Sequence, residues 1–389
     1  MPSISPPRPK PFETRLCKPK VAPMVFLPAE IYAIIFAEVE PSALAVLCRT
    51  CRHFLDQAQH ILFHTIDLEG HGMRATKSWC LAVTRHPHLA QRVAALSLQL
   101  PEVAKLDPAD GTKIHRALML CVNLKELKVT FEEILGGNHR SAGGWFINEC
   151  PFRLTKFNNL YFEQDWIAPF WRAQSELRVL SAPYCGPLTF SDEQLPNLVA
   201  VKVCDVQYLP AGRPLQRIEA PFPSSLDHYY SGLAQYSHSL TTLNLLRESA
   251  DTSIWHAVIL IARVLPALVN FGITEVKRSE RRSIAQSAPA NIFQNFCRLE
   301  TFVLLLINVT RFRDPDSRRI YAMGHEGHLK DFGAAIMEAC PTLRQTVLGS
   351  EVQLDRQLTC TLRRDLHGAI CSETGTTFDF DAMSKFWNP

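Results

Sequence analysis

The chain lacks an apolar run long enough to cross a membrane. Its 389 residues contain no uninterrupted stretch of about eighteen apolar residues, the minimum for a spanning helix. The opening residues Met1 to Ser5 also hold none of the apolar core that a secretory signal requires. We therefore expect a protein of the cytoplasm, the nucleus or both, with no membrane partner.

The chain also has little excess charge of either sign. Its 41 Lys and Arg residues against 38 Asp and Glu residues leave a formal charge of +3. An excess this small does not imply a polyanionic partner, and no basic stripe with interleaved aromatic residues is present. We expect no nucleic-acid partner.

Motifs of the common catalytic centres are missing too. The segment from Gly137 to Gly144 has no Gly-Lys-Ser/Thr for cradling phosphates, and no Gly-x-Ser-x-Gly nucleophile elbow occurs. His325 and His328 are three residues apart beside Gly327, whereas a zinc-protease helix places its histidines four apart. We predict a protein that is not an enzyme and holds no cofactor; a Cys/His pair that meets only in space stays open.

Twelve cysteines are present, but the missing signal argues against a disulfide framework. Cys48 and Cys51, with the nearby histidines His53, His60 and His64, resemble zinc ligands. A zinc finger needs about twelve residues between its two ligand pairs, and this spacing is shorter. We predict reduced, mostly buried thiols and no metal site.

Residues 24–68 predict a small helical module that follows a disordered, basic, proline-rich arm at residues 1–23. Pro28 suits a helix start because a first-turn residue needs no N–H, and Glu30 suits the helix dipole. Glu40 to Ser42 interrupt the apolar stripe, so a second helix begins there, and a third pattern runs from Phe54 to Leu62. Three short helices bury little by themselves, which favours a partner surface.

The strings Phe26-Leu27-Pro28-Ala29-Glu30-Ile31 and Leu47-Cys48-Arg49-Thr50-Cys51-Arg52-His53-Phe54 carry a resemblance to a known module. Residues 24–68 resemble an F-box, although the turn Pro41-Ser42-Ala43-Leu44 lacks the acidic residue that is frequent there and Phe54 stands where a Trp is often found. The resemblance implies a substrate receptor of an SCF-type cullin–RING ubiquitin ligase, bound to a Skp-type adaptor and through it to a cullin. The residues that would bury against the adaptor are Leu27, Pro28, Ile31, Ile34, Ile35, Leu44 and Leu47.

A second pattern recurs from residue 93 onward, where apolar residues follow the form Leu-x-x-Leu-x-Leu. Alternation within each unit predicts a short strand with one buried face. Helical stripes lie between several units, one around Ile114 and Leu118 and another around Phe332 and Ile336, and several end at a cysteine. The units begin at Val93, Leu124, Leu154, Leu177, Leu198, Leu215, Leu240, Leu268, Leu299 and Leu343.

This alternation predicts an α/β fold, an irregular leucine-rich-repeat-like solenoid over residues 69–349 with a C-terminal cap at 350–389. Successive units start between 17 and 44 residues apart, so leucines scattered through another α/β protein remain an alternative. The shortest step, Leu198 to Leu215, has room for a loop or 3₁₀ turn only. Insertions at 131–150, 277–291 and 308–328 are expected to be loops.

A protein target is expected on the strand face that carries the variable positions between the buried leucines. These positions mix both signs of charge, which suits a protein surface, although they are also compatible with plain exposed sheet positions. A scaffold without ligase role stays the alternative function. The candidate target-binding residues are Glu126, Lys128, Thr130, Lys156, Asn158, Lys202, Arg217, Glu219, Thr242 and Asn244.

Overall fold

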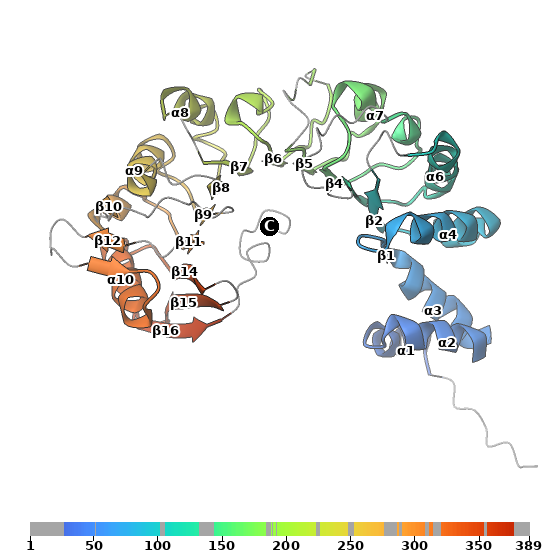
Figure 1. Ribbon diagram of the computed structural model, residues 1–389, viewed down its shortest axis with the longest axis horizontal. Coiled ribbons are helices and arrows are strands. Elements are labelled where there is room, and N and C mark those ends of the chain that lie inside the picture. Colours follow the sequence, from blue (N-terminus) through green and yellow to red (C-terminus); the bar gives the residue numbers. More distant parts are fainter. Residues whose placement is uncertain are drawn as a thin grey trace, which may run out of the picture. The chain divides into compact units, whose positions relative to one another are not determined.

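The structure is a computed structural model, shown in Figure 1, that divides into two compact units, Met1–Leu62 and Phe63–Pro389. The predicted arm at 1–23 and the aromatic residues expected in the C-terminal cap, Phe378, Phe380, Phe386 and Trp387, lie outside the described residues. The structure describes residues 27–50, 52–101, 106–131, 144–183, 188, 190–191, 193–222, 226–247, 253–275, 286–287, 290–307, 311–313, 320–353 and 356–376.

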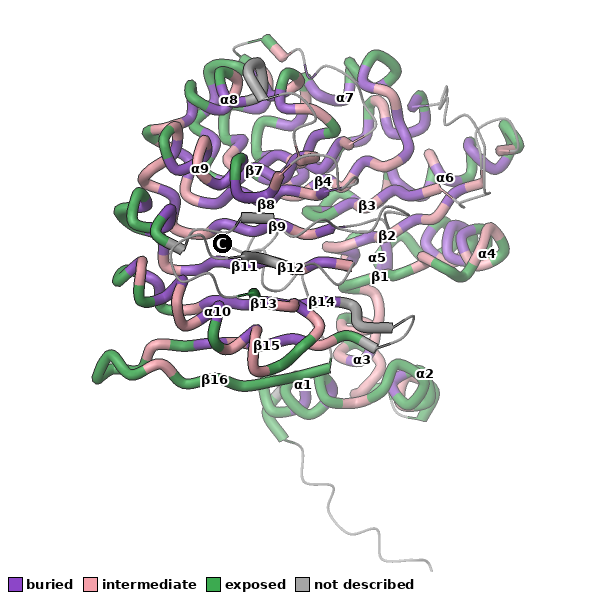
Figure 2. Tube along the Cα trace, turned by 60° about the vertical axis from the view of Figure 1, so that its left-hand side comes forward, coloured by how far each residue is buried: buried purple, intermediate pink, exposed green. Residues whose placement is uncertain are grey.

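The described part of the first unit consists of three helices, α1 (Ala29–Ala37), α2 (Pro41–Thr50) and α3 (Arg52–His64), the last of which ends two residues beyond Leu62 (Figure 1 and Figure 2). Their small core is built on Tyr32, Phe36, Leu44 and Ala58, all less than 9% exposed. The Phe54 ring packs edge-on against both Tyr32 and Phe36, with ring centroids 5.2 and 5.6 Å away. The core side of α1 is therefore aromatic, and its isoleucines occupy other faces.

The second unit is a mixed α/β structure around a large open sheet of thirteen described strands that follow one another in chain order. Neighbouring strands are parallel from the first strand to β14, and the last two pairings are antiparallel. The strands are β1 (Thr65–Asp67), β2 (Ala95–Leu100), β3 (Glu126–Phe131), β4 (Lys156–Asn159), β5 (Val179–Ser181), β6 (Ala200–Lys202), β7 (Arg217–Pro221), β8 (Thr242–Arg247), β9 (Asn270–Glu275), β11 (Thr301–Leu306), β14 (Gln345–Gln353), β15 (Arg356–Arg364) and β16 (Ile370–Gly375).

Ten of these strands, β2 to β9 with β11 and β14, coincide with the ten predicted apolar units. Each strand begins two residues after its unit does, and each unit's first residue is at most 2% exposed. One hydrogen-bond pattern recurs at the strand entrances: the Ala94 carbonyl accepts from the N–H groups of Lys125 and Glu126, and the Lys125 carbonyl accepts from those of Thr155 and Lys156. This repeated bond fixes the register from one strand to the next.

Helices cover one side of this sheet, and Figure 1 shows them outside the row of strands in the second unit. The stripes predicted around Ile114 and Ile336 lie in helices with those residues buried, and the short step after Leu198 holds a 3₁₀ turn, as expected. None of the described helices is long and apolar enough to cross a membrane. The helices are α4 (Gly72–Arg85), α5 (Pro87–Ala90), α6 (Pro108–Leu120), η2 (Gly144–Ile147), η3 (Asp165–Ile167), α7 (Ala168–Ala173), η4 (Val206–Tyr208), α8 (Leu226–Ala234), α9 (Ile254–Val264), η5 (Ala290–Asn295) and α10 (Glu326–Ala339).

The structure differs from the sequence-based expectation in two respects. The first unit ends at Leu62 rather than at residue 68, because Thr65–Asp67 pairs with β2 as the edge of the sheet. Two of the three insertions expected as loops, 277–291 and 308–328, contribute to a second sheet of β10 (Gln286–Ser287), β12 (Arg311–Arg313) and β13 (Ile320–Ala322). At the C-terminal end β15 packs on α10, where Leu362 lies so close to Gly333 that a Cβ added there would clash with it.

The described cysteines are all free thiols, and five of these nine are buried. The Cys121 thiol, at the end of α6, donates to the carbonyl of Ala117 at 3.3 Å. Burial raises the pKa of Cys80 and of Cys121 to about 12, so both are neutral and unreactive at physiological pH. Mostly buried thiols were expected, and five of the nine described cysteines are buried, while Cys204, Cys297 and Cys371 are exposed.

Asp110 ties α4 to α6. Its carboxylate lies 2.6 Å from Lys77 and 3.0 Å from Lys113, and its side chain is only 8% exposed. The hydrogen bond from Lys77 is the largest cause that lowers the pKa of Asp110, with Lys113 adding to it.

We expect Asp110→Asn to lower the free energy of unfolding by about 1–2 kcal/mol at pH 7, measured by urea titration. A lowered folded-state pKa stabilises the fold above the unfolded value of about 3.9, and this contribution is lost as the pH falls through the folded value. The difference between the variant and the wild type should therefore shrink in acid. Glu176→Gln, which breaks an exposed pair with Lys125, is the control and should change stability by less than about 0.5 kcal/mol.

Candidate functional site

The ten predicted target-binding residues lie on one face of the sheet, opposite the face that the core leucines occupy. Strand register places them in three neighbouring rows. One row holds Glu126, Lys156, Arg217 and Thr242; the next holds Lys128, Asn158, Lys202, Glu219 and Asn244; Thr130 lies in the third. We call this surface the inner face.

Five of the ten are not accessible. Thr130, Arg217, Glu219, Thr242 and Asn244 are each 6% exposed or less, so the expectation that they contact a target is corrected. Neighbouring side chains on a sheet are close enough to occupy one another's polar groups. Thr242 accepts a hydrogen bond from Asn270 at 3.2 Å, and Glu219 pairs with Lys202 at 2.5 Å.

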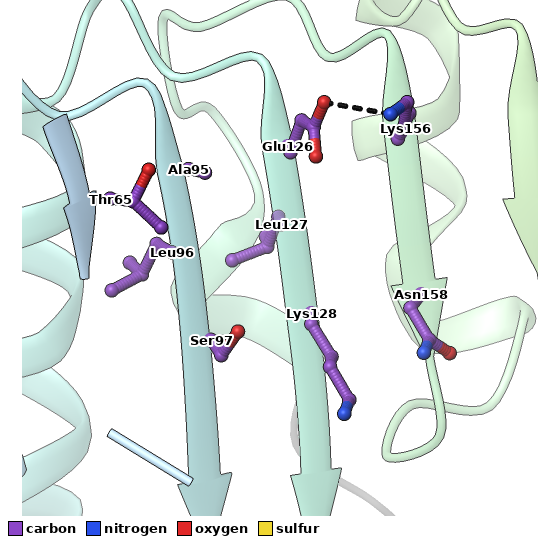
Figure 3. A pocket seen from close by; sticks show the side chains of 9 residues that line it. All are labelled: Thr65, Ala95, Leu96, Ser97, Glu126, Leu127, Lys128, Lys156 and Asn158. Carbon is purple, nitrogen blue, oxygen red and sulfur yellow. Dashed lines mark ion pairs between the residues drawn. The ribbon is translucent and has the colours of Figure 1, made fainter. Parts of the chain in front are cut away.

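Four of the accessible residues gather around one hollow. It has a volume of about 320 Å³ and lies over β1 to β4, where Glu126, Lys128, Lys156 and Asn158 form one side (Figure 3). The remaining lining comes from Thr65 on β1, from Ala95 and Ser97 on β2, and from Leu96 and Leu127. Because Ala95 and Ser97 of β2 have small side chains, space remains beside the longer side chains of β3 and β4.

The charges around the hollow occur as two exposed pairs. Glu126 and Lys156 lie 3.0 Å apart on adjacent strands, and Lys128 reaches Glu69 at 2.5 Å. Pairs this exposed contribute only about 0–1 kcal/mol each, so an incoming partner can displace them at low cost. The Oδ1 atom of Asn158 is buried without a hydrogen-bond partner among the described residues. The hollow therefore offers the charged groups of these two pairs for binding, whereas the enclosed Oδ1 atom of Asn158 is not available to a partner.

Sequence reasoning missed Thr65, Ala95, Ser97 and Glu69. Ala95 and Ser97 share the face of Glu126 and Lys128 by register, so the alternation already used for the later strands would have found them. Thr65 belongs to a strand that lacks the apolar repeat pattern, and Glu69 lies in the following turn. Neither of these two had a signal in the sequence.

The predicted adaptor-binding residues occupy the first unit. Leu27, Ile31, Ile34 and Ile35 are 40%, 41%, 65% and 45% exposed, and Pro28 beside them is exposed too. The structure departs from the expectation at two positions. Leu44 is 2% exposed, inside the core with Tyr32 and Phe36, and Leu47 is half-buried against that core. Leu44 and Leu47 therefore belong to the core of the first unit and not to its exposed apolar surface.

Among the described residues no three His, Cys, Asp or Glu side chains form a group able to hold a metal ion. His325 and His328 do meet, with ring centroids 4.6 Å apart, and His328 accepts a hydrogen bond from the N–H of Ala322. Cys51 lies outside the described residues.

Neither a scan of the chain against protein-family models nor a search of the curated proteins gives a significant match.

Proposed function

We propose that this chain is the substrate-receptor subunit of an SCF-type cullin–RING ubiquitin ligase. The first unit acts as the F-box that binds a Skp-type adaptor, and through it a cullin. The following strands and helices act as a leucine-rich-repeat-like solenoid that presents the inner face to a protein target. The chain itself supplies no catalytic group; its role is to bring the target close to the conjugating enzyme, which raises the effective concentration of the target.

The apolar surface of α1 is the observation that carries this proposal. Leu27, Ile31, Ile34 and Ile35 are large apolar side chains that remain 40–65% exposed although the unit they belong to has a core of its own. Contiguous exposed apolar side chains are typical of a protein interface. Four core residues are also few for a unit of this size, which agrees with a module completed by its partner.

The regularity of the second unit supports the receptor half of the proposal. Parallel neighbours in chain order, with a helix or 3₁₀ turn between many of them, are typical of repeat proteins that bind partners along an extended sheet. The polar hollow over β1 to β4 lies on that sheet and carries the accessible charges.

The test is co-purification of the full chain with a Skp-type adaptor. We expect a stoichiometric complex for the wild type, and about 100-fold weaker binding for Leu27→Ala/Ile31→Ala/Ile34→Ala, because truncating three interface side chains removes roughly 1 kcal/mol each. The variant should keep its circular dichroism spectrum, since none of the three residues belongs to the core.

The matched control truncates three exposed apolar residues of the second unit, Leu81→Ala/Trp166→Ala/Leu366→Ala, which are 51%, 52% and 102% exposed. Adaptor binding should be unchanged in this variant. A folded wild-type chain that binds no adaptor would contradict the ligase role and favour the alternative, an interaction scaffold whose partner contacts the same α1 surface.

A further inference from the structure

The helices α4 and α6 carry an unusual concentration of positive charge. They hold five cations, Arg74, Lys77, Arg85, Lys113 and Arg116, against one carboxylate, Asp110, so their net charge of 5 − 1 = +4 exceeds the +3 of the entire chain. Arg74, Arg85 and Arg116 are exposed, and the side chains of Lys77 and Lys113 are 48% and 57% exposed. The surface that these two helices present is therefore strongly basic.

Large apolar side chains stand among these cations. Leu81 on α4 is 51% exposed, Met119 on α6 is 38% exposed, and Trp145 on η2 is 46% exposed. Outside the first unit, exposed large apolar residues are few among the described residues, and these three are joined by packed elements. The surface can therefore attract anionic groups through its cations and apolar groups through its exposed Leu, Met and Trp side chains.

The surface is continuous and held in place. Asp110 bridges Lys77 of α4 and Lys113 of α6, which fixes the two helices side by side. Trp145 lies on Gly111 of α6 so closely that a Cβ there would be 2.8 Å from the indole ring. Its ring also contacts His115, with centroids 6.2 Å apart. Trp145 is thus held by its packed neighbours at a position where nearly half of it remains exposed.

We propose that this α4–α6 surface, the outward side chains of the two helices with Trp145, binds a membrane surface that contains anionic lipids. Anionic headgroups match the cations, and the boundary between headgroups and acyl chains takes up exposed Leu, Met and Trp side chains. A nucleic acid would satisfy the cations but would leave the aliphatic side chains without a partner. A protein partner is the remaining alternative, and its binding would not depend on the anionic lipid that the experiment below varies.

This contact requires no spanning helix, so it departs from the expectation of no membrane partner without conflicting with the lack of a long apolar run. It is independent of the F-box proposal, because it uses neither α1 nor the inner face. A receptor that also binds a membrane surface would select targets located there.

The experiment is sedimentation of the full chain with lipid vesicles at low ionic strength. We expect binding to phosphatidylcholine vesicles that contain about 30% phosphatidylserine, loss of binding at high salt, and none to pure phosphatidylcholine. Arg85→Glu/Arg116→Glu should weaken binding at least about 30-fold, since each cation near an anionic surface contributes about fivefold. Leu81→Ser should weaken it severalfold with the salt dependence retained.

The matched control is Arg344→Glu/Arg363→Glu, which makes the same change in net charge at side chains that are 76% and 62% exposed near the C-terminal end of the sheet. It should lower vesicle binding less than about threefold. The proposal is overturned if the wild type does not sediment with anionic vesicles, if the control loses binding as strongly as Arg85→Glu/Arg116→Glu, or if the chain binds single-stranded RNA and not vesicles.

Discussion

Replacing Glu275 by alanine should lower the free energy of unfolding by about 3–5 kcal/mol, because it removes a buried carboxylate that pairs with the buried guanidinium of Arg247. The two side chains are each 2% exposed, and their nearest atoms are 3.0 Å apart. Glu275 also accepts a hydrogen bond from the N–H of Ile307 at 3.0 Å, so it joins the ends of three successive strands. The guanidinium stands 5.9 Å from the centre of the Phe222 ring.

A double substitution distinguishes the effect of breaking the buried ion pair from the effect of losing contact area. Arg247→Met/Glu275→Leu removes both charges and keeps similar volumes, so it should unfold within about 2 kcal/mol of the wild type, the remaining loss coming from the unpaired N–H of Ile307. Urea unfolding followed by circular dichroism measures all three proteins. A single variant that loses less than about 1 kcal/mol, or a double variant as unstable as the single one, would contradict the buried-charge explanation.

Alternating apolar residues were sufficient to place the ten repeated strands, since a core-facing side chain every second residue is what a sheet buried on one side requires. The same alternation predicted which side chains share the inner face. It could not predict their accessibility, because burial of Arg217 or Asn244 depends on neighbours that are distant in the sequence. Of the five candidates that are not buried, four line the hollow, Lys128 and Lys156 among them.

Polar residues inside the fold were the least predictable. Asp110, Arg247 and Glu275 were not identified from the sequence, because a charged residue carries no sign there of a partner on another strand or helix. The strands of the second sheet, such as Arg311–Arg313, were not predicted for a related reason. Short, charged segments lack the apolar alternation that identifies a strand. The α1 isoleucines were read correctly as one stripe, while the aromatic side chains Tyr32 and Phe36 form the core.

Asn159, the last residue of β4, should be as intolerant of change as the buried ion pair. Its side chain is fully buried and satisfies three backbone groups: it accepts from the N–H groups of Tyr161 and Phe162 at 3.2 and 2.8 Å, and it donates to the Phe162 carbonyl at 2.9 Å. Asn159→Leu keeps the volume but removes these three buried hydrogen bonds. We expect a loss of about 3–5 kcal/mol in urea unfolding, since each unpaired buried group costs about 1–3 kcal/mol.

The matched control is Asn123→Leu, at an exposed asparagine that donates one hydrogen bond to the Gln91 carbonyl at 2.7 Å. It should cost about 1 kcal/mol or less. Equal losses in the two variants would show that the turn after β4 does not depend on Asn159. A large loss confined to Asn159→Leu would have a consequence for binding as well. Asn158 and Lys156 precede this turn on β4 and line the hollow, so a β4 that frays at its end would lose the side of the hollow that they form.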